Sequence, residues 1–234
     1  MKQLILFIII LLFGVVQMDA QPTKMSLQED YEELVDTKPH DSRDVWNRMA
    51  APAQLSWGST DIRYAKLNVP DIPKTNRLNL AAWKGERIHA QAVLWTKQNL
   101  DDVTVSVSDL RNGSSVIPAS EISTHFVRYV MTDELNKDGK GGCGHRFNKA
   151  DGVSLFVADV LDIISVRDIP ACSTQPIWMK IRVPSDVKSG KYKGIMTVSG
   201  ANFQPMKLQF EVNVLRRPLP NHKDWALHLD LWQH

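Results

Sequence analysis

The sequence lacks the charge imbalance of many nucleic-acid-binding proteins. Its 28 Lys and Arg residues stand against 26 Asp and Glu residues, which gives a net charge of +2 at pH 7. There is no basic patch interleaved with aromatic residues and no acidic tail. Basic patches of that kind bind the phosphates of DNA and RNA, so we expect no nucleic-acid partner.

Recognisable catalytic and metal-binding motifs are also missing. Ser and His residues are scattered, with no nucleophile-elbow pattern. Residues 139–146 contain a lysine without the Ser or Thr that follows it in a phosphate loop. Cys143 and His145 stand two apart without a second ligand pair, so we expect a surface loop, no metal site and no cofactor. The adjacent acids at 101–102 and 133–134 are expected to be solvated.

The N-terminus has the features of a secretory signal. Lys2 precedes an apolar run at residues 4–16, and Ala20 supplies a small residue at the cleavage position. The run is shorter than the ~20 residues that span a bilayer. No cysteine follows it, which rules out a bacterial lipid anchor at that point. We expect residues 1–20 to be a signal peptide and the mature protein to be exported, periplasmic or extracellular, without a stable membrane anchor.

Cys143 and Cys172 are the candidate pair for a disulfide. Export would place them in an oxidising compartment, where such a bond persists. A closed loop of about 30 residues would stabilise the fold by about 3–4 kcal/mol. The sequence leaves the pairing open, because it does not give the distance between the two residues.

From about residue 53 the chain consists of short β-rich segments separated by Gly, Pro, Asn and Asp. In residues 206–214 polar and apolar side chains alternate, which is typical of a half-buried antiparallel strand. Residues 200–205 separate this strand from 192–198 and predict a hairpin. Further strands are predicted at residues 87–95, 103–108, 125–131 and 177–183. We therefore expect an all-β fold, an antiparallel β-sandwich.

The sandwich is expected to span residues 51–216, after a polar lead-in at 21–50 to which we assign no function. Residues 215–220 contain two prolines, which fix the backbone and block ladder hydrogen bonds, so we interpret them as a connector. Residues 217–234 would then form a Pro-rich linker and one further strand.

Four tryptophans within the predicted sandwich allow two interpretations. We expect them to fill the core, as such residues usually do in sandwiches; exposed together, they would instead stack on sugar rings. They are Trp57, Trp83, Trp95 and Trp178.

Residues 225–234 alternate strictly between two faces of a predicted strand. One face is apolar, and the other carries His228, Asp230 and Trp232, a suitable wall for a polar, ring-shaped ligand. A single strand is not stable on its own. We interpret this one as the first strand of a domain whose remainder the sequence does not contain.

Three stretches together resemble the N-terminal region of bacterial glycoside hydrolase family 123-like proteins, which carry a DUF4091-type catalytic region. They are residues 83–95, 183–200 and 224–233. The Pro-x-Asp…Gly-x-Tyr-x-Gly pattern in the second stretch occurs in many accessory sandwiches of sugar-cleaving enzymes. All three in order, behind a signal peptide, are more specific, and the resemblance covers about residues 50–234.

The resemblance implies a β-sandwich, a linker and a (β/α)₈ barrel whose first strand would be residues 225–232. Proteins of this group hydrolyse β-linked N-acetylgalactosamine with an adjacent Asp-Glu pair on the barrel. Its Glu is the general acid/base, and its Asp orients the substrate's acetamido group as nucleophile. The sequence ends before such a pair, so no catalytic residue is assigned.

For this chain the resemblance implies the non-catalytic N-terminal domain of an exported glycoside hydrolase, which supports the missing barrel. Its partner would be a glycan or glycoconjugate bound through that barrel. His228, Asp230 and Trp232 would line the sugar pocket there, since the C-terminal ends of barrel strands surround the active site. The alternative is a free-standing carbohydrate-binding module.

Overall fold

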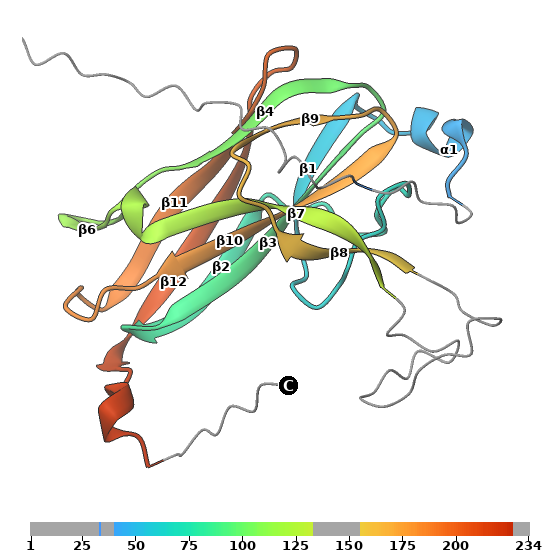
Figure 1. Ribbon diagram of the computed structural model, residues 1–234. Coiled ribbons are helices and arrows are strands. Elements are labelled where there is room, and N and C mark those ends of the chain that lie inside the picture. The colour runs from blue at the N-terminus through green and yellow to red at the C-terminus, as the bar shows by residue number, and fades with distance from the viewer. Residues whose placement is uncertain (1–32, 34–39, 133–154, 227–234) are drawn as a thin grey trace, which may run out of the picture.

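The computed structural model describes residue 33, residues 40–132 and residues 155–226. These residues form two β-sheets packed face to face, with very little helix (Figure 1). The all-β sandwich expected from the alternating segments is confirmed. The strands predicted between residues 87 and 214 are all present, and the predicted hairpin pairs residues 190–198 with residues 206–214 in antiparallel register. The strand predicted at residues 225–232 lies almost entirely outside the described residues and stays a prediction.

The first sheet has five strands, and its neighbouring strands are all antiparallel. Its order is β1 (Ala53–Gly58), β3 (Arg87–Thr96), β10 (Ser173–Arg182), β7 (Ile122–Thr132) and β8 (Leu155–Leu161). We call it the five-stranded sheet. A short helix, α1 (Arg43–Asn47), precedes it in the chain.

The second sheet has seven strands and one parallel pair, β2 with β12. Its main order is β2 (Arg77–Lys84), β12 (Met206–Pro218), β11 (Gly190–Ser199), β4 (Leu100–Val107) and β9 (Val166–Ile169). The short strands β5 (Leu110–Asn112) and β6 (Ser115–Ile117) are attached beside β11. The 3₁₀ turns are η1 (Ala119–Glu121) and η2 (His222–Asp224).

Alternation along the strands builds the core between the sheets. In β12 every second side chain from Leu208 to Val214 is buried, and the residues between them are polar. Trp57 on β1 joins the two sheets, because its ring meets Phe210 edge-on at a centroid distance of 5.9 Å. Its Nε1 donates to Gln209 O of β12 at 2.9 Å. The indole is thus fully buried without an unsatisfied donor.

The four tryptophans of the sandwich have different fates. Trp57 is buried in the core between the sheets, as expected. Trp95 is also buried, but in a separate apolar cluster on the outer face of the five-stranded sheet. Trp83 is 43% exposed on β2, so the prediction that it fills the core is wrong. Trp178 is half-buried beside Val127 and neighbouring side chains of β7 and β8. Trp83 and Trp178 lie on opposite outer faces of the sandwich, because their strand neighbours Ala82 and Ile177 both point into the core.

The strand β12 ends at Pro218, four residues beyond the predicted end at Val214. It therefore includes part of the segment predicted as a connector. Pro218 is accommodated beside the edge strand β2 after a register shift, and the next residue restores the ladder, since Leu219 N donates to Lys84 O at 2.7 Å. Proline is tolerated at such irregular positions because the ladder loses only one donor there.

The chain between β1 and β2, residues 59–76, crosses the outer face of the five-stranded sheet. Polar side chains of the sheet hold it through its backbone carbonyls. Gln91 Nε2 donates to Ser59 O at 2.5 Å, and Thr174 Oγ1 donates to Asn68 O at 2.7 Å. Because buried carbonyls need hydrogen-bond partners, these buried polar residues are what allows the segment to lie flat on the sheet.

An apolar cluster lies under this covering segment. It contains Trp46 from α1, Met49 just after α1, Tyr64 from the covering segment, and Val93 and Trp95 from β3. The polar lead-in thus delivers a fully buried tryptophan to the outer face of the sheet. The predicted domain boundaries themselves stay a prediction.

Candidate functional site

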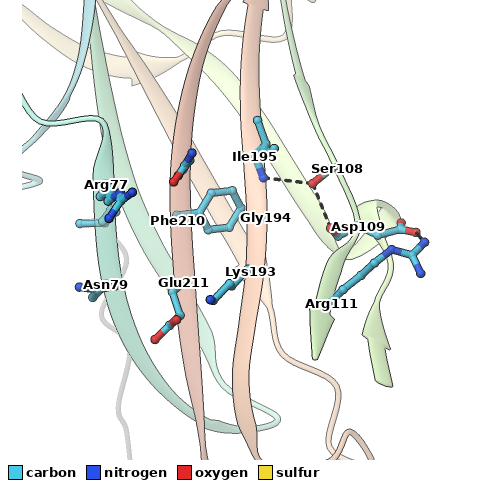
Figure 2. Close-up of a pocket in the computed structure, with 12 residues that line it drawn as sticks. Arg77, Asn79, Ser108, Asp109, Arg111, Lys193, Gly194, Ile195, Phe210 and Glu211 are labelled. Carbon is cyan, nitrogen blue, oxygen red and sulfur yellow. Dashed lines mark hydrogen bonds and ion pairs between the residues drawn. The ribbon is translucent and has the colours of Figure 1, made fainter. Parts of the chain in front are cut away.

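The outer face of the seven-stranded sheet has no covering segment among the described residues, and it contains a groove of about 760 Å³ (Figure 2). Outward-pointing side chains of β2, β11, β12 and β5 line it, together with the turn that follows β4. These are the polar positions that alternate with core residues along each strand. Its volume falls within the range of small-molecule sites.

The register of the sheet places the lining residues in two rows. One row crosses four strands and contains Asn79, Glu211, Lys193 and Arg111. The next row contains Arg77, Gln209 and Ile195. Directly opposed residues on neighbouring strands have Cβ atoms about 5 Å apart, so each row presents a continuous line of functional groups.

Gly194 lies between two outward-pointing residues of β11, where the ring of Phe210 packs against it (Figure 2). A Cβ atom at this position would lie 2.8 Å from Phe210 Cζ and 3.1 Å from Leu110 Cγ. A glycine at this position therefore lets the ring of Phe210 and the side chain of Leu110 pack close to β11. Phe210 itself is buried, so the groove has no exposed aromatic ring among its lining residues.

The two carboxylates of the groove already have cationic partners. Asp109 accepts from Arg111 Nη2 at 3.0 Å and from the backbone N–H of Ala119 at 3.0 Å. Glu211 pairs with Lys191 at 3.3 Å. These pairs neutralise the negative side chains of the groove and hold the Asp109 carboxylate in place.

Arg77 and Lys193 are exposed, and neither side chain has a hydrogen-bond or ion-pair partner among the described residues. The groove therefore presents two unpaired positive groups beside the amides of Asn79 and Gln209. This arrangement suits binding rather than chemistry, because it contains no nucleophile activated by a neighbouring base.

A second polar cluster lies beside the covering segment and is closed in on itself. Asp162 is buried and accepts from Arg128 Nη2 at 2.9 Å and from Arg167 Nη1 at 3.2 Å. Arg167 also pairs with Glu33 at 2.7 Å, and Glu33 pairs with Lys66. Each positive group in this network contacts a negative one, and this pairing offsets the free energy cost of burying the charges.

Lys66 is the titratable member of this cluster. Burial, and then the positive charge of Arg167, lower the pKa of Lys66 to about 8. Its Nζ also lies 5.8 Å from the ring centroids of both Tyr129 and Phe156. Each charged member contacts another member of the cluster, so among the described residues it is an internal network of ion pairs.

The residues predicted as a sugar-binding wall, His228, Asp230 and Trp232, lie outside the described residues and stay predictions. Trp225 and Ala226, the described start of that segment, follow η2 and are not in a strand. Cys172 is half-buried beside the apolar cluster under the covering segment, whereas Cys143 lies outside the described residues, so their disulfide stays a prediction.

Other predicted features are placed only in part. Asp101 and Asp102 are exposed, as expected for solvated acids, while the pair at 133–134 and the loop at 139–146 lie outside the described residues. In the described part of the chain no group of three His, Cys, Asp or Glu residues could hold a metal ion. No helix there is long and apolar enough to cross a membrane.

Sequence reasoning missed the groove residues. The alternation along residues 206–214 identified Gln209 and Glu211 as members of a solvent face, which was the available signal. That signal did not reach Arg77 or Lys193, because cross-strand register decides which residues share the face.

Comparison with known families identifies one match. The model of the glycoside hydrolase 123 N-terminal domain matches residues 57–200. This stretch runs from the end of β1 to just past β11 and includes strands of both sheets. A search of the curated proteins finds no match to this chain.

Among solved structures, a family 123 glycoside hydrolase from Clostridium perfringens, studied for glycolipid glycan hydrolysis, matches with a TM-score of 0.62 at 19% identity. The match covers 73% of this chain and 28% of that hydrolase, so the chain spans about a quarter of its length. The likeness is one of fold.

Two further structures match at lower TM-scores. A PapD-like domain of human CEP192 has a TM-score of 0.31 at 8% identity, covering 82% of this chain and 98% of that domain. AvmM, which catalyses a macrocyclisation in alchivemycin A biosynthesis, has a TM-score of 0.33 at 7% identity, covering 72% and 91%. Neither likeness carries an argument about this chain.

Proposed function

Because this chain belongs to the glycoside hydrolase 123 N-terminal domain family, we propose that it is the non-catalytic N-terminal sandwich of an exported glycoside hydrolase. The enzyme's substrates are β-linked N-acetylgalactosaminides, and the sandwich supports the catalytic barrel that follows it. The observation that carries the proposal is the family match across both sheets of one sandwich. The glycolipid glycan hydrolysed by the Clostridium protein supports a glycoconjugate substrate here as well.

Two described carboxyl groups, Glu121 and Asp162, are held by arginines, which agrees with a non-catalytic role for them. A glycosidase general acid needs a raised pKa so that it holds a proton at neutral pH. Hydrogen bonds from Arg182 lower the pKa of Glu121, which is the opposite direction. Asp162 is engaged by two arginines inside the fold. The chemistry is therefore proposed to reside on the barrel.

A role in supporting the barrel agrees with exposed apolar side chains at the end of the seven-stranded sheet. Trp83 and Leu215 point outward from the paired strands β2 and β12 and are 43% and 37% exposed. Trp225, just past the end of β12, is 48% exposed, and its Nε1 donates to Pro220 O. Exposed apolar groups gathered near one end of a domain favour contact with another domain.

Export is proposed from the sequence of residues 1–20, whose basic start, apolar run and Ala20 fit a cleaved signal. Edman sequencing of the secreted protein tests it. We expect the mature chain to begin at Gln21 or within a few residues of it. A secreted or cellular product that retains Met1 would contradict export through this segment.

The main experiment is an immunoblot of the native protein with antibodies against residues 51–215, followed by hydrolysis assays. We expect a band about twice the size of this chain, because a barrel adds about 250 residues. That product should hydrolyse aryl β-N-acetylgalactosaminide, and the 234-residue chain should not. Turnover by the purified 234-residue chain that disappears when Asp109 or Glu211 is replaced would overturn the non-catalytic role.

A further inference from the structure

The groove on the outer face of the seven-stranded sheet is not accounted for by support of a barrel. It combines two cations that have no partner in the described part of the chain, Arg77 and Lys193, with two amides, Asn79 and Gln209, in one hollow of about 760 Å³ (Figure 2). Arginine and lysine that serve only solubility need no shared concavity. Their shared position along one hollow favours a ligand-binding role.

The pairing of the groove's charges sets the sign of that ligand. Asp109 is neutralised by Arg111, and Glu211 by Lys191, so the groove's free charge is positive. An anion here would gain charge-assisted hydrogen bonds, which are about twice as strong as neutral ones. A neutral sugar would find no exposed aromatic ring for stacking, because Phe210 is buried.

The spacing of the two cations sets the ligand's size. Arg77 on β2 and Lys193 on β11 are separated by β12 and lie in adjacent rows. Strands lie about 4.8 Å apart and successive outward residues about 6.7 Å apart, which places the two Cα atoms about 12 Å apart. Both side chains are long and exposed, so together they reach anionic groups along this span, and an oligomer with repeated anionic groups fits it.

We propose that this groove binds an oligosaccharide that carries sulfate or carboxylate groups, with Arg77 and Lys193 holding two of its anionic groups. Asn79 and Gln209 would bond its hydroxyl and acetamido groups. The choice of a saccharide rests on the proposed function, whereas the choice of an anion rests on the groove alone.

The test is calorimetric titration of the 234-residue chain with a chondroitin 4-sulfate hexasaccharide. The comparison ligand is the same hexasaccharide, desulfated and with its carboxyl groups reduced. We expect the anionic ligand to bind, with an affinity that falls as NaCl rises, and the neutral one not to bind. No binding of the sulfated ligand, or equal binding of both, would overturn the proposal.

Paired variants locate the site. Arg77→Gln with Lys193→Gln should weaken binding at least about tenfold, since two charge-assisted contacts are lost. The matched control is Arg87→Gln with Lys180→Gln, which removes the same charges from the outer face of the five-stranded sheet. It should change the affinity less than about twofold at fixed salt. Equal losses in the two double variants would mean non-specific attraction and would refute the groove.

A third variant reverses the sign of the effect. Glu211→Gln removes the carboxylate beside Lys193 and should tighten binding by about threefold, because a like charge near the ligand is lost. Weaker binding by this variant would contradict an anionic ligand at this position.

The longer gene product separates this proposal from the proposed function. Hydrolysis of aryl β-N-acetylgalactosaminide without binding of the sulfated ligand would refute the groove and leave the proposed function standing. Binding of the sulfated ligand without hydrolysis would refute the proposed function and leave the anion-binding groove standing. Loss of thermal stability of the longer product in the Arg77/Lys193 variant, without any saccharide binding, would show that the barrel occupies the groove instead.

Discussion

The two outer faces of this sandwich are built from the same kind of alternating strand but have opposite fates. The outer face of the five-stranded sheet is covered by residues 59–76 and α1, which bury Trp46 and Trp95 against it. No described segment covers the outer face of the seven-stranded sheet, which carries the groove with Arg77 and Lys193. The difference lies in the outward-pointing residues of the strands.

Where residues 59–76 cover the five-stranded sheet, the outward-pointing residues of β3 and β10 are uncharged hydrogen-bonding groups and large apolar groups, whereas the charged Arg87 and Lys180 lie on exposed parts of the same face. Gln91 and Thr174 hold the carbonyls of the covering segment, and Val93 and Trp95 bury its underside. On the open face the corresponding positions are mostly charged residues and amides. A similar segment over the open face would bury charged side chains without partners, which costs free energy. One face is therefore structural, and the other is left for a ligand.

The largest expected effect comes from Trp95→Ala on the covered face. Trp95 is 2% exposed, and its removal leaves a cavity under the covering segment, so we expect a loss of about 4 kcal/mol in the free energy of unfolding. Urea denaturation followed by circular dichroism measures it. Trp83→Ala, on the open side and 43% exposed, should cost less than about 1 kcal/mol. Similar losses for both would remove the distinction between the faces.

The buried charges give the next largest effect. Asp162→Asn removes the buried carboxylate that pairs with both Arg128 and Arg167 and should destabilise the fold by about 3 kcal/mol. The same change at Asp109, whose pair with Arg111 is solvent-accessible, should cost less than about 1 kcal/mol. Both are read from urea midpoints under identical conditions. A small loss at Asp162 would mean that its ion pairs are not needed to hold the covering segment.

A pH dependence on the covered side should be smaller than either. The pKa of Lys66 is lowered from 10.5 to about 8 by burial and by Arg167. Between these values the unfolded chain binds more protons than the folded one, so this residue's contribution to stability rises as pH increases from about 8 to 10.5. The stability difference between the protein and its Lys66→Met variant, measured from pH 7 to 10.5, isolates this contribution. A difference that does not change with pH would contradict the lowered pKa.

The smallest effect is expected for the groove itself. Arg77→Gln with Lys193→Gln removes two exposed side chains without partners among the described residues, so the free energy of unfolding should change by less than about 0.5 kcal/mol. Thermal and urea denaturation test this directly. A loss above about 1.5 kcal/mol would place these residues with the structural face, because surface groups free of contacts do not contribute that much.

The sequence predicts the strands far better than the contacts between them. Alternation along residues 206–214 predicts which side chains of β12 are buried, because a pleated strand turns every second residue inward. Nothing local predicts that Trp83 is exposed and Trp95 is buried. Both lie in apolar surroundings in the sequence. Trp95 is buried because the covering segment lies over its sheet, and no described segment lies over Trp83 on the other sheet.

The groove and the buried charges were unpredictable for the same reason. The buried charges come from three separate parts of the chain, represented by Lys66, Arg128 and Asp162. The register of the sheet alone places Arg77 and Lys193 on the same face, with β12 between them. Register follows from turn geometry and core packing of the whole domain. The two-proline segment misled for a related reason, since Pro218 is accommodated beside an edge strand after a register shift.

The position of β12 has a consequence for how the protein is made. β12 is the last strand of the described chain to leave the ribosome, yet it lies between β2 and β11 and bonds both. Arg77 and Gln209, which lie opposite each other in the register of β2 and β12, are separated by more than half of the chain's length. In the described sheet β2 pairs only with β12, so β2 waits unpaired through most of synthesis. Such distant pairings make folding slow. The seven-stranded sheet is complete only after β12 has been synthesised. In a nascent chain stopped before Met206, the edges of β2 and β11 that bond β12 are unpaired and prone to aggregation.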